Sequence, residues 1–230
     1  MDRAGSRSTS DQQGAAAEVA GVAEAAPRGG RVRSVGFLLR VAGVCLIAGS
    51  VLWQPLLAAE HLGHLERRSA RWAWYADQTG FLLAMVLVLA GLVALDRARV
   101  AGEHRVGRWA LHGLVLGWFL LVVAQLGSLG FAWRAADAMT GVGGLLTYPT
   151  VVLAGAAAVG AGRLTGWRRW TLLGEAVYQL ALILVPLLLG AGGPGWAAEA
   201  GWQLCWLVVG VAAVQQPGPS PALDPARRAG

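Results

Sequence analysis

The chain has 230 residues, of which 56% are hydrophobic and only 14% are charged, and its mean hydropathy is +0.52. This balance is too apolar for a water-soluble domain with an ordinary surface. The formal net charge is +6, but all nineteen basic residues are arginine and they cluster between apolar runs, which is typical of membrane orientation. No nucleic-acid partner is therefore expected.

Both ends of the chain are predicted to be disordered cytoplasmic tails. Residues 1–33 are rich in Ala, Gly, Ser and Gln and have little apolar surface to bury, so ordering them would cost entropy without compensation. Residues 216–230 contain four prolines, which lack the amide donor that a helix needs. The expected domain organisation is a transmembrane domain at 34–215 between these two tails.

Six apolar runs separate the charge clusters, each near the ~20 residues that a helix needs to cross the hydrocarbon of a bilayer. Helices are expected rather than isolated strands, because backbone amides in lipid must find partners within their own segment. The predicted fold class is all-α, a polytopic transmembrane bundle of about six spans. The spans are expected at 34–58, 80–95, 109–133, 142–161, 171–191 and 197–214.

The arginine clusters also predict the orientation, because membrane proteins keep arginine-rich loops on the cytoplasmic side. With the N-terminus inside, the inner segments hold fourteen arginines, and an odd number of spans would break this division. Both termini are therefore expected in the cytoplasm. The outer loops hold four arginines, which are Arg67, Arg68, Arg71 and Arg134.

Tryptophan and tyrosine are expected to form belts at the two membrane surfaces, where an amphipathic ring is favoured. The predicted inner belt consists of Trp109, Trp167 and Trp170. The predicted outer cluster consists of Trp53, Trp72, Trp74, Tyr75, Trp133, Trp196 and Trp202.

The fourth run is unusually rich in small residues, which let a neighbouring helix backbone approach closely. That helix is therefore expected to be central to the bundle. Its glycines are Gly141, Gly143, Gly144, Gly155, Gly160 and Gly162. Pro55, Pro149 and Pro186 fall inside the runs and are expected to kink them.

A few polar residues lie inside the apolar runs, where an ionisable group is costly unless it is paired. Glu175 and Gln179 share one helix face, and a contact between Glu175 and His112 would lower the cost for both. Such a pair either has a structural role, in which it holds two helices together, or a functional role, in which it relays protons or binds a lipid headgroup. Gln125 and Tyr148 are expected to form hydrogen bonds between helices.

Two candidate sites are expected on the outer side. Glu60, His61 and His64 would meet on one face of a helix as metal ligands or an acid/base group, or they are simply solvated loop residues. Asp77 and Glu199 lie near outer tryptophans, and such carboxylates with aromatic walls suit an organic cation or a carbocation. The alternative for these two is an ordinary aromatic belt.

The sequence favours an integral membrane protein without catalytic activity, which packs with a membrane-protein partner or a second copy in the bilayer. One alternative is an enzyme acting on a lipid or isoprenoid at the outer pocket, with Asp77, Glu199 or Glu60 as proton donor. Another is a small transporter or channel subunit. No cofactor and no metal are expected. The use of arginine without lysine indicates a bacterial cytoplasmic membrane.

Overall fold

The computed structural model describes residues 28–63, 71–130, 135–190 and 195–216. The chain divides into two compact units, Met1–Val35 and Gly36–Gly230. Of the first unit, residues 28–35 are described and are helical. Most of the predicted tails, at 1–27 and 217–230, lies outside the described residues, so their disorder stays a prediction, whereas residues 28–33, predicted as part of the first tail, belong to a helix.

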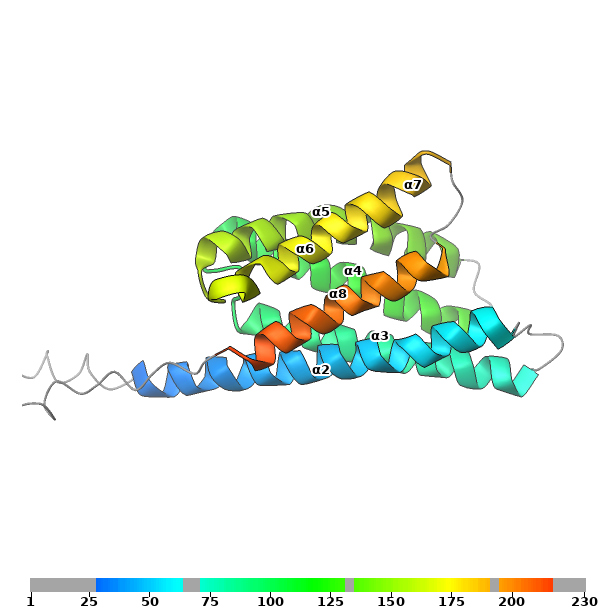
Figure 1. Cartoon of the computed structure of the whole chain (residues 1–230), viewed down its shortest axis with the longest axis horizontal. Coiled ribbons are helices and arrows are strands. Elements are labelled where there is room, and N and C mark those ends of the chain that lie inside the picture. Colours follow the sequence, from blue (N-terminus) through cyan, green and yellow to red (C-terminus); the bar gives the residue numbers. More distant parts are fainter. Residues whose placement is uncertain (1–27, 64–70, 131–134, 191–194, 217–230) are drawn as a thin grey trace, which may run out of the picture. The chain divides into compact units, whose positions relative to one another are not determined.

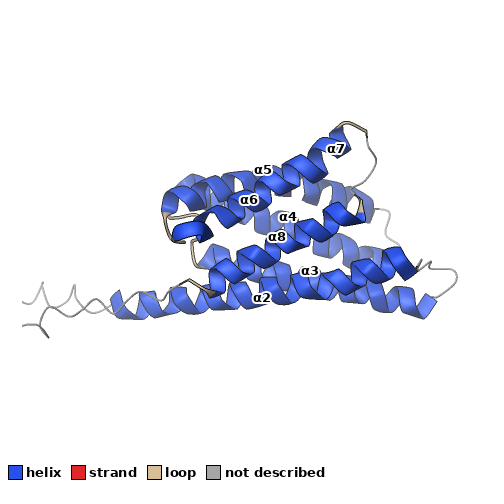
Figure 2. Ribbon diagram, in the orientation of Figure 1, coloured by secondary structure: helices blue, strands red, loops and turns tan. Residues whose placement is uncertain are grey.

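The described residues contain helices and no strands (Figure 2). The helices, labelled in Figure 1, are α2 (Arg28–Gly63), α3 (Arg71–Arg97), α4 (Arg105–Gly130), α5 (Ala135–Ala161), the 3-10 helix η1 (Gly166–Trp170), α6 (Thr171–Gln179), the π-helix η2 (Leu180–Leu184), α7 (Val185–Leu188) and α8 (Trp196–Val214). The segment from η1 to α7 is helical throughout and forms the fifth apolar stretch.

Six helical stretches in the described residues are long and apolar enough to cross a membrane, which confirms the predicted all-helical class and the number of long apolar helices. They are Ser34–Glu60, Trp72–Arg97, Arg105–Leu129, Ala135–Ala161, Gly166–Leu188 and Trp196–Val214. The second differs most from its predicted bounds of 80–95, because the helix runs through Asp77 instead of beginning after it.

Close contacts at glycines show that α2 runs antiparallel to both α3 and α8. A Cβ on Gly49 would lie 2.8 Å from the carbonyl oxygen of Ala84, and a Cβ on Gly91 would lie 3.1 Å from that of Ala42. On the α8 side, a Cβ on Gly210 would lie 2.9 Å from the carbonyl oxygen of Gly43. These positions leave no room for a side chain, so glycine sets how closely the helices pack.

Helix α5 packs against both α4 and α6 (Figure 1), but it is no more buried than the other long helices, so its predicted central place is not confirmed. A Cβ on Gly143 would lie 2.9 Å from the carbonyl oxygen of Gly117 in α4. A Cβ on Gly155 would lie 2.7 Å from the Cα of Leu173 in α6. The small residues of α5 therefore bring two neighbouring backbones close, as the sequence predicts.

The outward faces of the helices carry large apolar side chains, whereas several polar side chains are buried. Leu116 and Phe119 on α4 are each 50% exposed, and the same holds along the other long helices. Ser50, Thr147 and Gln203 are buried. An exposed apolar surface of this extent is unusual for a soluble monomer and suits contact with lipid.

Candidate functional site

Glu175 is a carboxylate enclosed within the bundle, with 1% of its surface exposed. Its Oε1 atom accepts one hydrogen bond from Gln179 Nε2, at 2.5 Å, and a second from Trp202 Nε1, at 2.9 Å. The first bond confirms that Glu175 and Gln179 share a helix face. The second joins α6 to α8, and the sequence analysis did not predict it.

These bonds fix the orientation of the Gln179 amide. Because its nitrogen donates to Glu175, its oxygen points elsewhere, and Gln179 Oε1 is buried with no hydrogen-bond partner in the described part of the chain. Gln179 also lines a cavity of about 520 Å³. A completely buried amide oxygen thus remains unsatisfied next to the cavity wall, which is energetically unfavourable, and it has no accessible surface toward the cavity.

The cavity lies between α5, the segment from α6 to α7, and α8, with one residue each from α2 and α4. It is formed by the first half of α5 and the first turns of α8, so it lies toward the end of the bundle where the α8 helix begins. Most of its wall is aliphatic. Its large aliphatic residues are Leu121, Leu145, Ile183, Leu184, Leu187 and Leu188.

A π-helical turn forms part of the cavity wall. The backbone N–H of Val185 donates to Leu180 O, five residues earlier, instead of four as in an α-helix. The turn precedes Pro186, whose missing N–H and bulky ring disrupt ordinary α-helical bonding. Ile183 and Leu184 of this widened turn line the cavity. Proline in the fifth run therefore reshapes the backbone at the cavity, and π-turns of this kind are frequent at functional sites.

Tryptophan rings back the cavity on the side of α2 and α8. Trp202 lies 5.5 Å from Trp118 and 6.5 Å from Trp53 between ring centroids, and Trp118 lies 5.9 Å from Trp206. Trp53 and Trp202 were predicted to belong to the outer belt. Both are half-buried, pack against other aromatic rings and line the cavity, and their place in an outer belt stays a prediction.

The two outer carboxylates have different positions. Glu199 is half-buried and lines the cavity together with Trp202, as the outer-pocket hypothesis expects. Asp77 is buried in α3, has no hydrogen-bond partner among the described residues, and does not line this cavity. Of the two, only Glu199 is placed beside the cavity.

The hypothesis of a cluster of Glu60, His61 and His64 is not tested. Glu60 is exposed on α2 and His61 is helical, while His64 lies outside the described residues. In the described part of the chain, no three His, Cys, Asp or Glu side chains are grouped as metal ligands.

The predicted contact between Glu175 and His112 is replaced by separate pairings. His112 Nε2 lies 3.2 Å from Asp96 Oδ2, near the connection between α3 and α4. Gln125 Nε2 donates to Gln78 Oε1 at 2.7 Å, which confirms that Gln125 joins two helices. His112 and Gln125 therefore join α3 to α4 and do not line the cavity.

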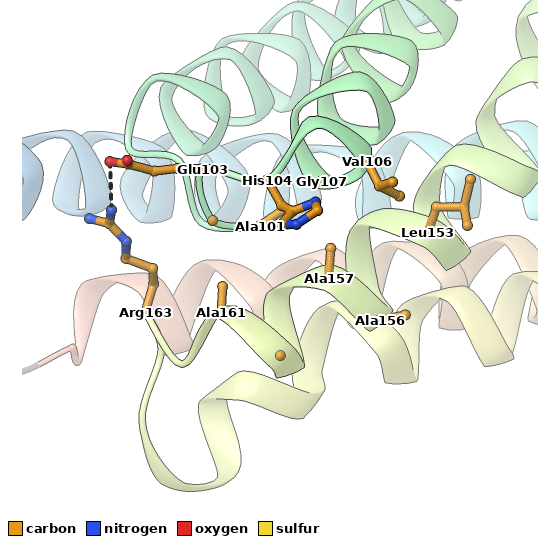
Figure 3. A pocket seen from close by; sticks show the side chains of 12 residues that line it. Ala101, Glu103, His104, Val106, Gly107, Leu153, Ala156, Ala157, Ala161 and Arg163 are labelled. Carbon is orange, nitrogen blue, oxygen red and sulfur yellow. Dashed lines mark hydrogen bonds and ion pairs between the residues drawn. The ribbon is translucent and has the colours of Figure 1, made fainter.

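A second cavity, of about 560 Å³, lies between the α3–α4 connection and the last turns of α5 (Figure 3). Its wall is mostly alanine and glycine, and Glu103 and Arg163 pair at its edge with an N–O distance of 3.3 Å. Glu103 also pairs with Arg99 at 3.2 Å. Glu103 and Arg163 are thus paired with each other at the edge, while His104 also lines the cavity.

Sequence reasoning missed Gln203, Trp118 and Trp206, which are all completely buried. Both polar atoms of Gln203 and the indole N–H groups of the two tryptophans lack hydrogen-bond partners among the described residues. Gln203 lies inside the sixth apolar run, just as Gln125 lies inside the third, so its position could have been used to predict a buried polar side chain. No comparable signal in the sequence separates these two tryptophans from those of the belts.

Searches against protein-family models, curated proteins and solved structures find no match to this chain. The six apolar helices and the apolar exterior indicate the class of multi-pass helical membrane proteins.

Proposed function

We propose that this protein is a non-catalytic multi-pass protein of a bacterial cytoplasmic membrane that binds an apolar small molecule in the cavity beside Gln179. The observation that carries the proposal is the concave, largely apolar wall of a cavity of about 520 Å³, which also contains the side chains of Tyr148, Glu199 and Trp202. A concave apolar surface with a few polar groups is the usual character of a small-molecule site.

Two glycines of α5 leave the cavity open. A Cβ added to Gly141 or Gly144 meets no atom within 4 Å, and both residues line the cavity. Gly143 lies between them in sequence, on the face that contacts α4. The small residues of α5 thus have two uses, which are close helix packing on one face and free volume on another.

Photolabelling with a long-chain alcohol that carries a diazirine tests the proposal. We expect labelled peptides from α5 and from the segment containing Leu187 in the full-length protein in detergent. Gly144→Leu should reduce this labelling at least fivefold, because its side chain would fill the cavity. Gly174→Leu is the matched control, since Gly174 is exposed, meets no atom within 4 Å of an added Cβ and does not line the cavity. Labelling that Gly144→Leu leaves unchanged would count against the site.

One observation favours the alternative of an enzyme acting on a lipid or isoprenoid. Glu199 and Trp202 lie in the same cavity wall, which places a possible proton donor beside an aromatic ring. This alternative now rests on Glu199, since Asp77 does not line the cavity. Chemical conversion of a bound isoprenoid alcohol that disappears in Glu199→Gln would favour it over simple binding.

The proposed orientation has both termini in the cytoplasm. The segments 96–108 and 162–170, which include the α3–α4 and α5–η1 connections, hold seven arginines, and the ion pair between Glu103 and Arg163 joins them at one end of the bundle. The end of α8 lies there too, because Gln216 Nε2 donates to Arg163 O at 3.2 Å. An arginine-rich end is expected on the cytoplasmic side, which would place the cavity in the outer half. A membrane-protein partner or second copy stays a prediction.

A further inference from the structure

The second cavity combines a mostly apolar wall with a charged edge (Figure 3). We call it the Gly160 groove. On the α5 side its wall consists of Leu153, Ala156, Ala157, Gly160 and Ala161. A Cβ added to Gly160 meets no atom within 4 Å, so these mostly small residues leave free space in a groove of about 560 Å³. That space suits an apolar chain.

One carboxylate at the edge of this groove faces two guanidinium groups. Glu103 Oε1 lies 3.2 Å from Arg99 Nη1 and 3.3 Å from Arg163 Nη2. One negative charge is therefore shared by two positive charges, and all three side chains are also in contact with solvent. The edge of the groove has an excess of positive charge, which favours an anion.

The charges around this edge have the same balance. The segments 96–108 and 162–170 hold seven arginines and one further carboxylate, Asp96. Asp96 Oδ2 is already engaged, at 3.2 Å from His112 Nε2. Neither carboxylate of these two segments is therefore left to compensate the remaining arginines.

The beginning of α4 adds to the attraction for an anion. Val106 and Gly107, in the first turn of this helix, line the groove, and the turn contains no acidic residue. Backbone N–H groups at the start of a helix carry partial positive charge. His104 precedes this turn and also lines the groove, so its imidazole N–H can donate to an anionic oxygen.

The groove lies at the depth where lipid phosphates are expected. Trp109, Trp167 and Trp170 are about half exposed or more at the same end of the helices. Exposed tryptophans of this kind mark the level of the headgroups in membrane proteins. A lipid in the groove would therefore place its phosphate beside the arginines and its chains toward the hydrocarbon.

We propose that the Gly160 groove binds an anionic phospholipid, whose phosphate lies against Arg99, Arg163 and His104 and whose acyl chain lies along the wall formed by α5. This site is separate from the Gln179 cavity and goes beyond the proposed function. A free phosphate ion would use only the charged edge, whereas a phospholipid uses the edge and the apolar wall together. Basic pockets between spans hold anionic headgroups in this way.

Two lipids with the same acyl chains, phosphatidylglycerol and the zwitterionic phosphatidylcholine, test this inference. Native mass spectrometry measures the affinity of the first bound lipid on the delipidated full-length protein in an uncharged detergent. We expect phosphatidylglycerol to bind at least about tenfold more tightly, because only its headgroup has a net negative charge. Gly160→Leu, which fills the groove, should remove this preference. Gly144→Leu is the matched control, because Gly144 lines the other cavity.

Three results of this measurement would overturn the inference. The first is equal affinity for the two lipids, or no measurable binding of phosphatidylglycerol. The second is an unchanged preference in folded Gly160→Leu. The third is displacement of phosphatidylglycerol by glycerol phosphate at an equal concentration, since a chainless competitor would show that the apolar wall contributes nothing.

Substitutions at the edge test the role of charge in both directions. Arg163→Gln should weaken binding of phosphatidylglycerol about fivefold and leave that of phosphatidylcholine unchanged. Glu103→Gln should strengthen binding of phosphatidylglycerol, because it releases Arg99 and Arg163 for the phosphate. Arg40→Gln is the control, since Arg40 is exposed on α2 and does not line the groove. Equal losses in Arg163→Gln and Arg40→Gln, or weaker binding in Glu103→Gln, would overturn the assignment to this groove.

Discussion

Glu175 is stabilised within an apolar helix by side chains instead of by water. Its Oε1 atom accepts N–H groups from its own helix and from α8, so the carboxylate ties two spans together. The same bonds turn the Gln179 oxygen away from Glu175 and leave it buried without a hydrogen-bond partner in the described part of the chain. One buried carboxylate thus joins two spans and also sets the orientation of the neighbouring amide.

At the residue scale, this arrangement predicts different outcomes for two substitutions of Glu175. Glu175→Ala leaves the N–H groups of Gln179 and Trp202 unpaired, and each buried unpaired group costs about 1–3 kcal/mol of stability. Glu175→Gln keeps an oxygen that can accept them, so its unfolding temperature should lie well above that of the alanine variant. Thermal unfolding in detergent measures the difference.

Glu103→Ala is the control for this comparison, because Glu103 has a 65% exposed side chain and exposed ion pairs contribute little to stability. Equal unfolding temperatures for Glu175→Ala and the wild type would show that these bonds do not join α6 to α8 in solution.

The polar residues of the interior were only partly predictable from the sequence. Pairing of Glu175 with Gln179 followed from their spacing of four residues, since such residues are neighbours on a helix. The partner from α8 did not, because Trp202 looks in the sequence like any other tryptophan at the end of a span. The pairing of His112 with Asp96 was missed for a similar reason, since both lie near helix ends whose depth the sequence does not define.

At the scale of elements, α5 is the helix on which packing depends most. Glycines that look equivalent in the sequence have distinct surroundings. Gly155 contacts the backbone of α6, whereas Gly160 borders the second cavity and has no atom within 4 Å of an added Cβ. The small-residue pattern therefore predicts that α5 is central, but not which of its glycines hold neighbouring helices.

We expect Gly155→Leu to be far more damaging than Gly160→Leu. An added Cβ at Gly155 would lie 2.7 Å from Leu173 Cα, and a backbone atom cannot move aside without separating the helices. The yield of monodisperse protein and its unfolding temperature should fall sharply in Gly155→Leu and remain near wild type in Gly160→Leu. Similar behaviour of the two variants would contradict the close approach of α5 and α6.

The existence of the spans was predictable because length and hydropathy alone define it, whereas their boundaries were not. The charge of Asp77 suggested a loop, yet the residue is buried within α3. A carboxylate marks a boundary only when it faces outward, and the hydropathy of a single run does not reveal the direction in which a side chain points. The π-turn before Pro186 was not predictable from hydropathy either, although the proline indicated that the helix would depart from regular geometry there.

At the scale of the whole molecule, arginine is concentrated at one end of the helices in the second unit, although Arg71 begins α3 at the other end. The connections that follow α3 and α5 carry seven arginines and two carboxylates in the segments 96–108 and 162–170. Trp109, Trp167 and Trp170 are about half exposed or more at the same end, as expected for an interfacial belt. This difference between the two ends predicts an orientation in the membrane, which can be tested in intact cells.

Single cysteines at the two ends should report the orientation in a background in which Cys45 and Cys205 are replaced by alanine. A cysteine in place of Glu103 should resist a membrane-impermeant maleimide in intact cells and react after permeabilisation, because its connection is expected in the cytoplasm. A cysteine in place of Trp72, which is 80% exposed at the other end of α3, should react in intact cells. The reverse pattern would place the arginine-rich end outside the cell, although positively charged loops are normally retained in the cytoplasm. The Gln179 cavity would then be accessible from the inner half of the membrane instead of the outer half.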